Sequence, residues 1–217
     1  MVKKIFTLLF VAAITASAAV AAEKYTPSRA AISASMRDHA AYKALSDRFA
    51  SGQQLTPAQI GEVYYGTVFQ PGFKASVTYP DIARTYAAGD YATTLSQVWT
   101  VLAKDPANLY LLFTGYGAAR SLKNEEAASL LQKRLLQVCD LIFSTGTGVT
   151  SDSPYLVVHP SDIDEFVVKY IQPVKVLGRA TLEGCQAVRV NLDNNADDVI
   201  LYFKTFNQYF GYFLRIC

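Results

Sequence analysis

The chain has 217 residues, of which 51% are apolar and 18% are charged, and its formal net charge is +2. This composition excludes a disordered chain, and three cysteines are too few for a small fold built on disulfides. The length is that of one domain of ordinary size or of two small ones.

Residues 1–22 have the pattern of a secretory signal peptide. Lys3 and Lys4 are followed by an apolar run over 5–14, which is about half as long as the roughly twenty residues that span a bilayer. Small residues then lead to a cleavage position after Ala22. We therefore expect an exported protein, periplasmic or extracellular and soluble after cleavage. An uncleaved membrane anchor is the alternative.

The mature chain over 23–217 carries no net formal charge, because the leader holds two lysines and no acidic residue. A neutral protein has no general attraction for nucleic acid or for anionic lipid, so we expect neither as a partner. No later segment is long and apolar enough to predict an integral membrane segment.

Two helices are predicted before the chain becomes irregular. Residues 33–49 have apolar side chains at helical spacing. Thr56 and Gln59 have the spacing of a capping box, and the helix that they begin is expected to end at Gly66. Residues 67–80 are aromatic and are interrupted by proline and glycine, which predicts a loop.

The segment 81–143 is the most regular part of the chain. Four helices are expected, at about 81–88, 91–104, 108–122 and 125–142. The turn Gly89-Asp90-Tyr91 resembles that of a tetratricopeptide hairpin, and matching residue types recur at the repeat period of about 34. The matching positions are Thr94, Val98, Val101 and Pro106, then Leu111, Gly115, Ala118 and Ala128. We interpret the segment as about one and a half such repeats. A generic pair of helical hairpins is the alternative.

After Gly146 and Gly148 the pattern changes to period two, which is typical of strands. Strands are expected at 155–159, 174–182, 188–192, 199–204 and 209–216, with one short helix over 161–170 whose N-cap is Ser161. The chain is therefore predicted to be α+β: a helical part over about 33–143 and a small, mostly antiparallel sheet over about 150–217, in a single mature domain.

Several short stretches, in their order along the chain, resemble a family of exported proteins of unknown function from Gram-negative, gut-type bacteria. They are Leu55-Thr56-Pro57, Tyr64-Tyr65-Gly66, Val68-Phe69-Gln70-Pro71, Gly146-Thr147-Gly148, Asp164-Glu165-Phe166 and Leu201-Tyr202-Phe203. Phe166 stands where Tyr is expected. The resemblance implies export and one shared architecture, and it brings no catalytic motif.

Signals for catalysis, metals and cofactors are weak, and we expect no catalytic, metal or cofactor site. The two histidines, His39 and His159, lack zinc-ligand spacing, so both are interpreted as structural or solvated. No G-x-S-x-G motif is present. A triad of Ser151 or Ser153 with His159 and Asp162 is the remaining alternative for a nucleophilic enzyme.

Two loop motifs are interpreted as structural. The pair Gly146 and Gly148 lacks the helix start that phosphate binding needs, so it is expected to be a linker. The run Asp193, Asn195 and Asp197 begins like a calcium loop, but Asp198 stands where glycine is needed, which favours a hairpin turn.

Three acidic residues lie close together at Asp162, Asp164 and Glu165. A pair of carboxyl groups is what glycoside hydrolysis requires. Acidic residues are also favoured in the first turn of a helix by its dipole, and this explanation needs no substrate. We favour the structural explanation and keep an envelope hydrolase of glycan or peptide as the alternative function.

Aromatic residues are the most suggestive feature, and one cluster lies in the loop after the capping-box helix. Such rings pack in a core or anchor a partner. We expect Phe69 to pack inward, and at least one of Tyr65, Phe73 and Tyr79 to be exposed as a partner-binding residue. The leading hypothesis is thus a non-enzymatic binding or scaffold protein of the cell envelope, whose helical hairpins present a concave face to a peptide or protein. A small-molecule carrier with a pocket inside the sheet is a further alternative.

The cysteines are interpreted according to the part of the chain in which they lie. Cys139 lies among apolar residues at helical spacing and is expected to be a buried thiol. Cys185 and Cys217 are the one pair for which a disulfide is considered.

Overall fold

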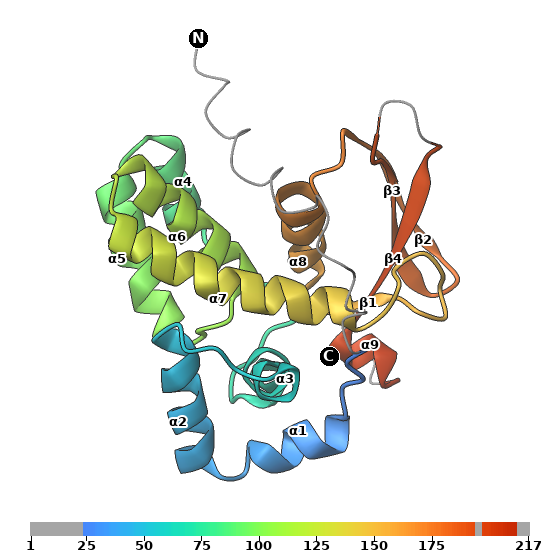
Figure 1. Cartoon of the computed structure of the whole chain (residues 1–217), viewed down its shortest axis with the longest axis horizontal. Helices are drawn as coiled ribbons and strands as arrows, with labels where there is room; N and C mark the ends of the chain where they lie inside the picture. Colours follow the sequence, from blue (N-terminus) through green and yellow to red (C-terminus); the bar gives the residue numbers. More distant parts are fainter. Residues whose placement is uncertain (1–23, 194–196, 212–217) are drawn as a thin grey trace.

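The computed structural model describes residues 24–193 and 197–211 (Figure 1). Helices α1 to α7 form one side of the molecule, and a four-stranded sheet with α8 forms the other. The long helix α7 (Glu125–Ser144) runs from the helical side to the edge of the sheet, beside β1 (Tyr155–Val157). The α+β class is confirmed.

The helix expected over 33–49 is wrong as a single element. The structure has two helices, α1 (Arg29–Ser35) and α2 (His39–Ala50). Asp38 is the N-cap of the second, and its carboxylate accepts a hydrogen bond of 3.0 Å from the amide of Ala41. A cap of this kind favours a new helix start over continuation of the first. His39 is exposed at that start.

Helix α3 (Pro57–Gly66) begins and ends as predicted. The Thr56 side chain accepts from the amide of Gln59 at 3.3 Å, and the Gln59 side chain accepts from the amide of Thr56 at 3.1 Å. This reciprocal pair satisfies two amides that the first turn leaves without partners. A short 3₁₀ turn, η2 (Thr67–Phe69), follows the helix.

The four regular helices are confirmed as α4 (Pro80–Ala87), α5 (Tyr91–Leu102), α6 (Leu109–Ser121) and α7. Each packs on the next along the chain. Gly115 lies where α5 and α6 approach, and a Cβ there would be 2.8 Å from Val98 Cγ1. Ala128 is 2% exposed. Small residues thus permit close helix contact, and the tetratricopeptide interpretation of these hairpins stays a prediction.

The sheet has the order β1-β4-β3-β2. The other strands are β2 (Lys175–Leu182), β3 (Cys185–Asn191) and β4 (Val199–Thr205). β2, β3 and β4 pair in antiparallel fashion, whereas β1 pairs with β4 in parallel. The expected mostly antiparallel sheet is confirmed, and only the parallel pair needs a crossover connection, which runs from β1 through α8, β2 and β3 to β4.

Two predictions at the C-terminal side are corrected. The strand expected over 209–216 is wrong at its start, because α9 (Phe206–Tyr209) forms there with Thr205 as its N-cap; residues 212–216 lie outside those described. The N-cap of α8 (Pro160–Glu165) is His159 and not Ser161, because Pro160 takes the first helical position. The helix then continues as a π-helical turn, η3 (Phe166–Ile171).

One buried core joins the two sides. The hydroxyl of Tyr65 on α3 donates a hydrogen bond of 2.9 Å to the carbonyl oxygen of Leu156 in β1. The Tyr65 ring stacks on Phe206 of α9, with 4.9 Å between the ring centroids. Phe69 is half-buried and packs edge-on against the same Phe206 ring. These contacts hold α3 between the helical hairpins and the sheet.

The linker and the cysteines agree with their structural interpretations. Gly148 has a φ of +70°, and its amide bonds to the Ser153 carbonyl at 2.8 Å in a tight turn. Cys139 and Cys185 are free, buried thiols, and Cys217 lies outside the described residues. Residues 193–197 are described only at their ends. Within the described part of the chain, no helix is both long and apolar enough to cross a membrane.

Candidate ligand-binding site

A cavity of about 340 Å³ lies where the first turns of α4, α6 and α8 meet, and we call it the α8 cavity. It is lined by Val77, Thr78, Tyr79, Pro80, Ala83, Asn108, Tyr110, His159, Ser161, Asp162, Asp164 and Glu165. The volume is at the lower end of the range for pockets that bind small ligands, about 300–1,000 Å³. The cavity therefore fits a small molecule or a single side chain.

Two tyrosines form an aromatic wall of this cavity. Tyr79 precedes α4, and Tyr110 lies in the first turn of α6. Their rings stack nearly parallel, at an interplanar angle of 9° and 5.8 Å between centroids. The Tyr79 hydroxyl accepts a hydrogen bond of 3.1 Å from the Asn108 carboxamide, which holds the ring in place. Burial, followed by the nearby Asp105 carboxylate, raises the pKa of Tyr79 to about 12.

Asp162 lies deepest in the acidic part of the cavity, and it is 2% exposed. Its Oδ2 accepts hydrogen bonds from the Tyr64 hydroxyl at 2.7 Å and from the His159 amide at 3.0 Å. Its Oδ1 accepts none from the residues that the structure describes. Burial raises the pKa of Asp162, and the neighbouring His159 opposes that shift. Asp162 is thus a buried carboxyl with one oxygen bonded and the other unbonded.

The other two acidic residues of the cavity have cationic partners. Asp164 is exposed and forms an ion pair of 2.6 Å with Arg179 of β2. Glu165 is half-buried and forms an ion pair with Lys169 of η3. Burial nevertheless raises the pKa of Glu165, and the attraction of Lys169 opposes this. The cationic partners leave Asp162 as the least compensated acidic residue of the three.

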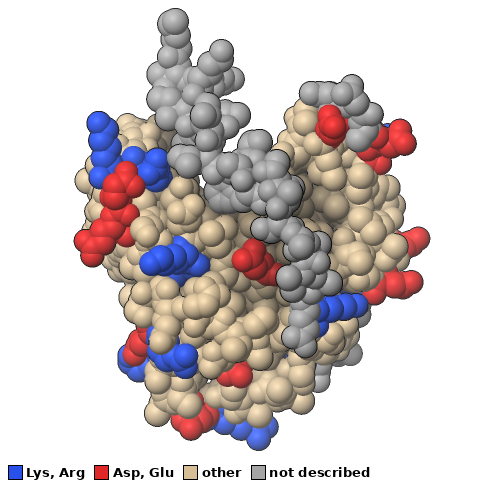
Figure 2. Space-filling view, in the orientation of Figure 1, with Lys and Arg blue, Asp and Glu red and all other residues tan. Residues whose placement is uncertain are grey.

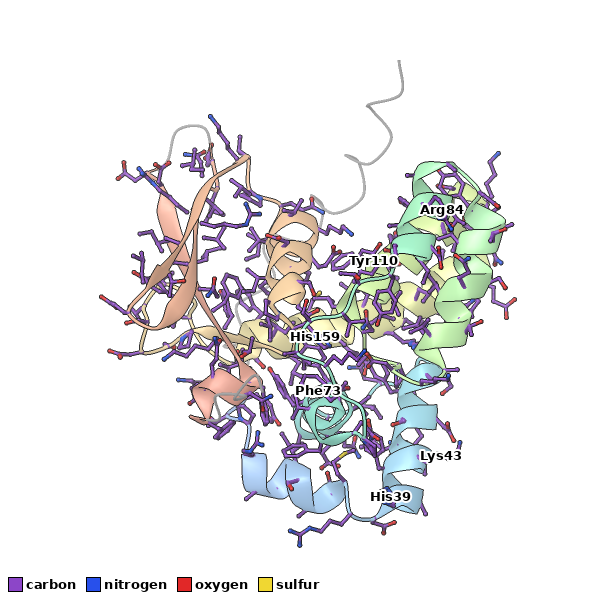
Figure 3. All side chains as sticks on the ribbon, turned by 180° about the vertical axis from the view of Figure 1, so that it is seen from behind. His39, Lys43, Phe73, Arg84, Tyr110 and His159 are labelled. Carbon is purple, nitrogen blue, oxygen red and sulfur yellow. The ribbon has the colours of Figure 1, made fainter. Side chains whose placement is uncertain are left out.

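His159 closes one end of the cavity. Its ring stacks on Phe73 at 5.4 Å between centroids, and its Nδ1 donates to the carbonyl oxygen of Ala75 at 3.1 Å. Figure 3 shows His159 and Tyr110 near the middle of the molecule, between α8 and the helical hairpins, with Phe73 beside His159. Nδ1 carries its proton toward the loop, so Nε2 is the ring atom left for other contacts.

A fourth carboxyl group lies behind the cavity. Asp105, in the turn before α6, accepts hydrogen bonds from Asn108 at 3.0 Å and from the Thr67 hydroxyl at 3.4 Å. Burial raises its pKa, although both hydrogen bonds and His159 oppose the shift. Asn108 also accepts from the Leu111 amide at 3.1 Å, so it is both the N-cap of α6 and the link to Tyr79.

The predicted partner-binding residues lie in different surroundings. Tyr65 is completely buried, so the expectation that it contacts a partner is wrong for this structure. Phe73 and Tyr79 are half-buried, and only Tyr79 lines the cavity. That these two bind a partner stays a prediction. The acidic residues Asp162, Asp164 and Glu165, kept as alternative catalytic carboxyl groups, all line the cavity.

Sequence reasoning missed Tyr110 and Asn108, and it interpreted His159 as a structural residue. A usable signal was present in the pairs Tyr79-Pro80 and His159-Pro160. Proline starts a helix and restricts the preceding residue to extended backbone, so both aromatic rings had to stand at a helix N-cap. Asn108 is likewise an N-cap, two residues after a proline.

The structure does not support the alternative serine triad or a metal site among the described residues. Ser153 accepts a hydrogen bond of 3.0 Å from the Thr147 amide, and neither it nor Ser151 lines the cavity with His159. Among residues 24–193 and 197–211, no three His, Cys, Asp or Glu side chains are grouped to hold a metal ion. Figure 2 shows basic and acidic side chains interspersed over the visible face of the molecule.

Comparison with known proteins places the chain in one family. No curated protein matches the chain, and no solved structure matches it. A family model with the description "Domain of unknown function (DUF4919)" matches residues 30–205, which extend from the second residue of α1 to the end of β4 and include every residue that lines the α8 cavity. Because the match extends over most of its length, the chain belongs to the DUF4919 family.

Proposed function

We propose that the protein is an exported, non-enzymatic binding protein of the cell envelope that holds its ligand in the α8 cavity. The observation that carries this proposal is the cavity itself, with stacked Tyr79 and Tyr110 on one side and carboxyl groups on the other. Apolar rings with a few converging polar groups are typical of a ligand pocket. The volume of about 340 Å³ suits a small molecule or one side chain of a peptide or protein partner.

Binding is favoured over hydrolysis by the state of the acidic residues. A glycosidase needs two carboxyl groups free to act as acid and as base or nucleophile. Asp164 and Glu165 are held by Arg179 and Lys169. The bonded oxygen of Asp162 receives Tyr64 and the start of α8, which is a structural role. No specific observation therefore favours the hydrolase.

Export rests on the sequence pattern of residues 1–22. Mass spectrometry of the protein secreted from its host should find Glu23 as the first residue. A full-length chain retained in the membrane fraction would contradict cleavage, and it would leave the binding proposal unaffected.

The cavity is tested by filling it. Ala83 lines the cavity from an exposed position on α4, whereas Ala87, one turn further along the same helix, is exposed and does not line it. We expect Ala83→Trp to block a ligand and Ala87→Trp to leave binding intact. The measurement is ¹H–¹⁵N NMR of the mature protein with a panel of amino acids, tripeptides and mono- and disaccharides.

A panel ligand should shift the amide signals of residues 77–83 and 159–165 in the wild type and in Ala87→Trp only. If the shifts persist in Ala83→Trp, or if they lie elsewhere in the chain, the cavity is not the ligand site. If no compound of the panel shifts these signals, the proposed function fails for these three ligand classes.

A further inference from the structure

We infer that the α8 cavity is selective for an organic cation, an ammonium or guanidinium group carried on a short apolar stem, with the charge beside Asp162 and the stem against Tyr79 and Tyr110. This inference rests on the proposed function and names the ligand class of the same site. Free amines and the side chains of lysine or arginine in a peptide share this chemistry.

The charge of the lining carries the first step of the argument. Three described residues of the lining have a carboxyl group, and none of the described lining residues is lysine or arginine. The cationic partners Lys169 and Arg179 bind Glu165 and Asp164, and neither of them lines the cavity. His159 is the one described residue of the lining that can carry a positive charge beside Asp162, so a ligand that enters the cavity meets a carboxyl group with no lysine or arginine partner.

The unbonded oxygen of Asp162 carries the second step. Asp162 is only 2% exposed, and its Oδ1 receives no hydrogen bond from the described residues. A neutral ligand would remove the remaining water from this carboxylate and leave its charge unpaired, which is costly. An ammonium or guanidinium group would instead supply the missing donor and the opposite charge.

The protein's own Lys169 shows how a cation is held at the edge of this site. Its Nζ forms the ion pair with Glu165 and lies 5.8 Å from the ring centroid of Tyr110 and 5.3 Å from that of Phe113. A carboxylate together with aromatic faces is the usual environment for a bound ammonium group. The cavity repeats this combination with Asp162 and the Tyr79–Tyr110 pair.

An anionic ligand is disfavoured by the three carboxyl groups of the lining, and some of the amides at the three helix starts are not free to bind it. Backbone amides at a helix start bind anions only when they are free. The Leu111 amide of α6 is taken by the Asn108 side chain, and the Asp162 amide of α8 by the His159 carbonyl. Pro80 and Pro160 have no amide hydrogen at the first positions of α4 and α8.

The test compares three probes that share one capped amino-acid backbone and differ in the charge of the side chain, in the wild-type mature protein. N-acetyl-lysine methylamide carries the cation, N-acetyl-norleucine methylamide is its neutral analogue, and N-acetyl-glutamate methylamide is the anion. We expect the lysine probe to bind at residues 159–165 at least about tenfold more tightly than either of the others. Hexylamine, which lacks a peptide backbone, separates the sources: equal binding indicates a free amine, and weaker binding indicates a peptide side chain.

Two variants test whether Asp162 and Tyr110 cause this selectivity, and a third variant is the control. Asp162→Asn keeps an acceptor for Tyr64 and His159 but removes the charge, so the lysine probe should lose about tenfold in affinity while the norleucine probe is unchanged. Asp81→Asn, an exposed carboxyl at the start of α4, is the matched control and should change neither. Tyr110→Leu keeps an apolar wall without the aromatic face, so it should lower the ratio of lysine to norleucine affinity and serves as well if Asp162→Asn does not fold.

Equal binding of the lysine and norleucine probes, tighter binding of the glutamate probe, or no shift with any of the three would overturn the inference. The proposed function would stand in those cases if Ala83→Trp still blocks another ligand of the panel. Both would fall only if no ligand in either experiment binds at the α8 cavity.

Discussion

The hairpin helices and the outer strand of the sheet differ most in how far their side chains are buried. Most of α6 is buried on all sides, between α5 and α7. β2 has one half-buried residue and is otherwise exposed, because it pairs only with β3 at the edge of the sheet. The free energy of folding from apolar burial is therefore concentrated in the helical side and in the inner strands.

The two sides also differ in what they bury. The contacts between α5, α6 and α7 are mostly apolar, but the helical side also buries the guanidinium group of Arg134, which is 2% exposed and donates to the Pro106 carbonyl oxygen. The junction with α8 buries the carboxyl group of Asp162, with no ion pair to a described cation. Both sides thus bury a charged group without an ion pair to a described residue, but only Asp162 lines the α8 cavity, which makes the junction with α8 the candidate functional region. Four predictions test this difference between the two regions.

The largest effect is expected where the two sides meet. Tyr65→Ala removes a buried ring stacked on Phe206 and the hydrogen bond to Leu156, and it should lower the free energy of unfolding by about 3–5 kcal/mol. Urea denaturation measures this. Tyr65→Phe keeps the ring and should cost only about 1–2 kcal/mol. Equal losses in the two variants would show that the hydroxyl, not ring packing, joins the two sides.

A smaller effect is expected inside the hairpins. Ala128 is 2% exposed on α7, so Ala128→Leu should overpack the helix contact and cost about 1–3 kcal/mol. Ala92→Leu, at an exposed position of α5, is the matched control and should change the melting temperature little. An unchanged melting temperature in Ala128→Leu would contradict close packing of these helices.

The third prediction concerns pH and Asp162. Its pKa in the folded state lies above the ordinary value of 3.8 because of burial, so the folded protein binds a proton that the unfolded chain has already released. Stability therefore falls as pH rises above 3.8 toward the raised pKa, by up to about 1.4 kcal/mol per pH unit for this group. Denaturation curves at several pH values should show a smaller slope in Asp162→Asn.

Asp105 and Glu165 have raised pKa values as well, so part of the slope remains in that variant. The exposed Asp81 of α4, which does not line the cavity, supplies the control, and Asp81→Asn should keep the wild-type slope. A slope that is the same in Asp162→Asn and in the wild type would mean that burial of Asp162 does not cost stability.

The smallest effect is expected at the outer strand. Leu177 of β2 is 38% exposed at an irregularity in its pairing with β3. Leu177→Ser should change the free energy of unfolding by less than about 0.5 kcal/mol, and Leu201→Ser, buried in β4, should cost several times more. A large loss in Leu177→Ser would show that this face of β2 is covered in solution.

Local signals predicted most of the elements. The cap at Thr56, the turn at Gly89 and the alternation near 188–192 act within a few residues, so α3, the hairpin helices and the antiparallel strands were expected in the right places. Errors occurred where two local signals competed. Asp38 breaks a periodic stretch into two helices, and Thr205 starts a helix in an aromatic run that suits a strand.

The site was predicted only in part, for a different reason. Asp162, Glu165 and Tyr79 attracted attention through their residue type and neighbours, but no local pattern tells which aromatic side chain is buried. Tyr65 and Tyr79 belong to the same aromatic segment, and only the packing of β1 and α9 on α3 covers the first and leaves the second beside the cavity.

Sequence patterns alone were enough to predict the α+β class, the capped start of α3 and membership of a family, because periodicity, caps and short motifs are properties of neighbouring residues. The tertiary structure decided the α8 cavity. Its parts, Tyr79, Asn108 and Asp162, lie at the starts of three helices, and the hydrogen bond from Tyr64 to Asp162 joins residues 98 positions apart. Such contacts depend on how the helices pack on the sheet, which no short stretch of sequence specifies.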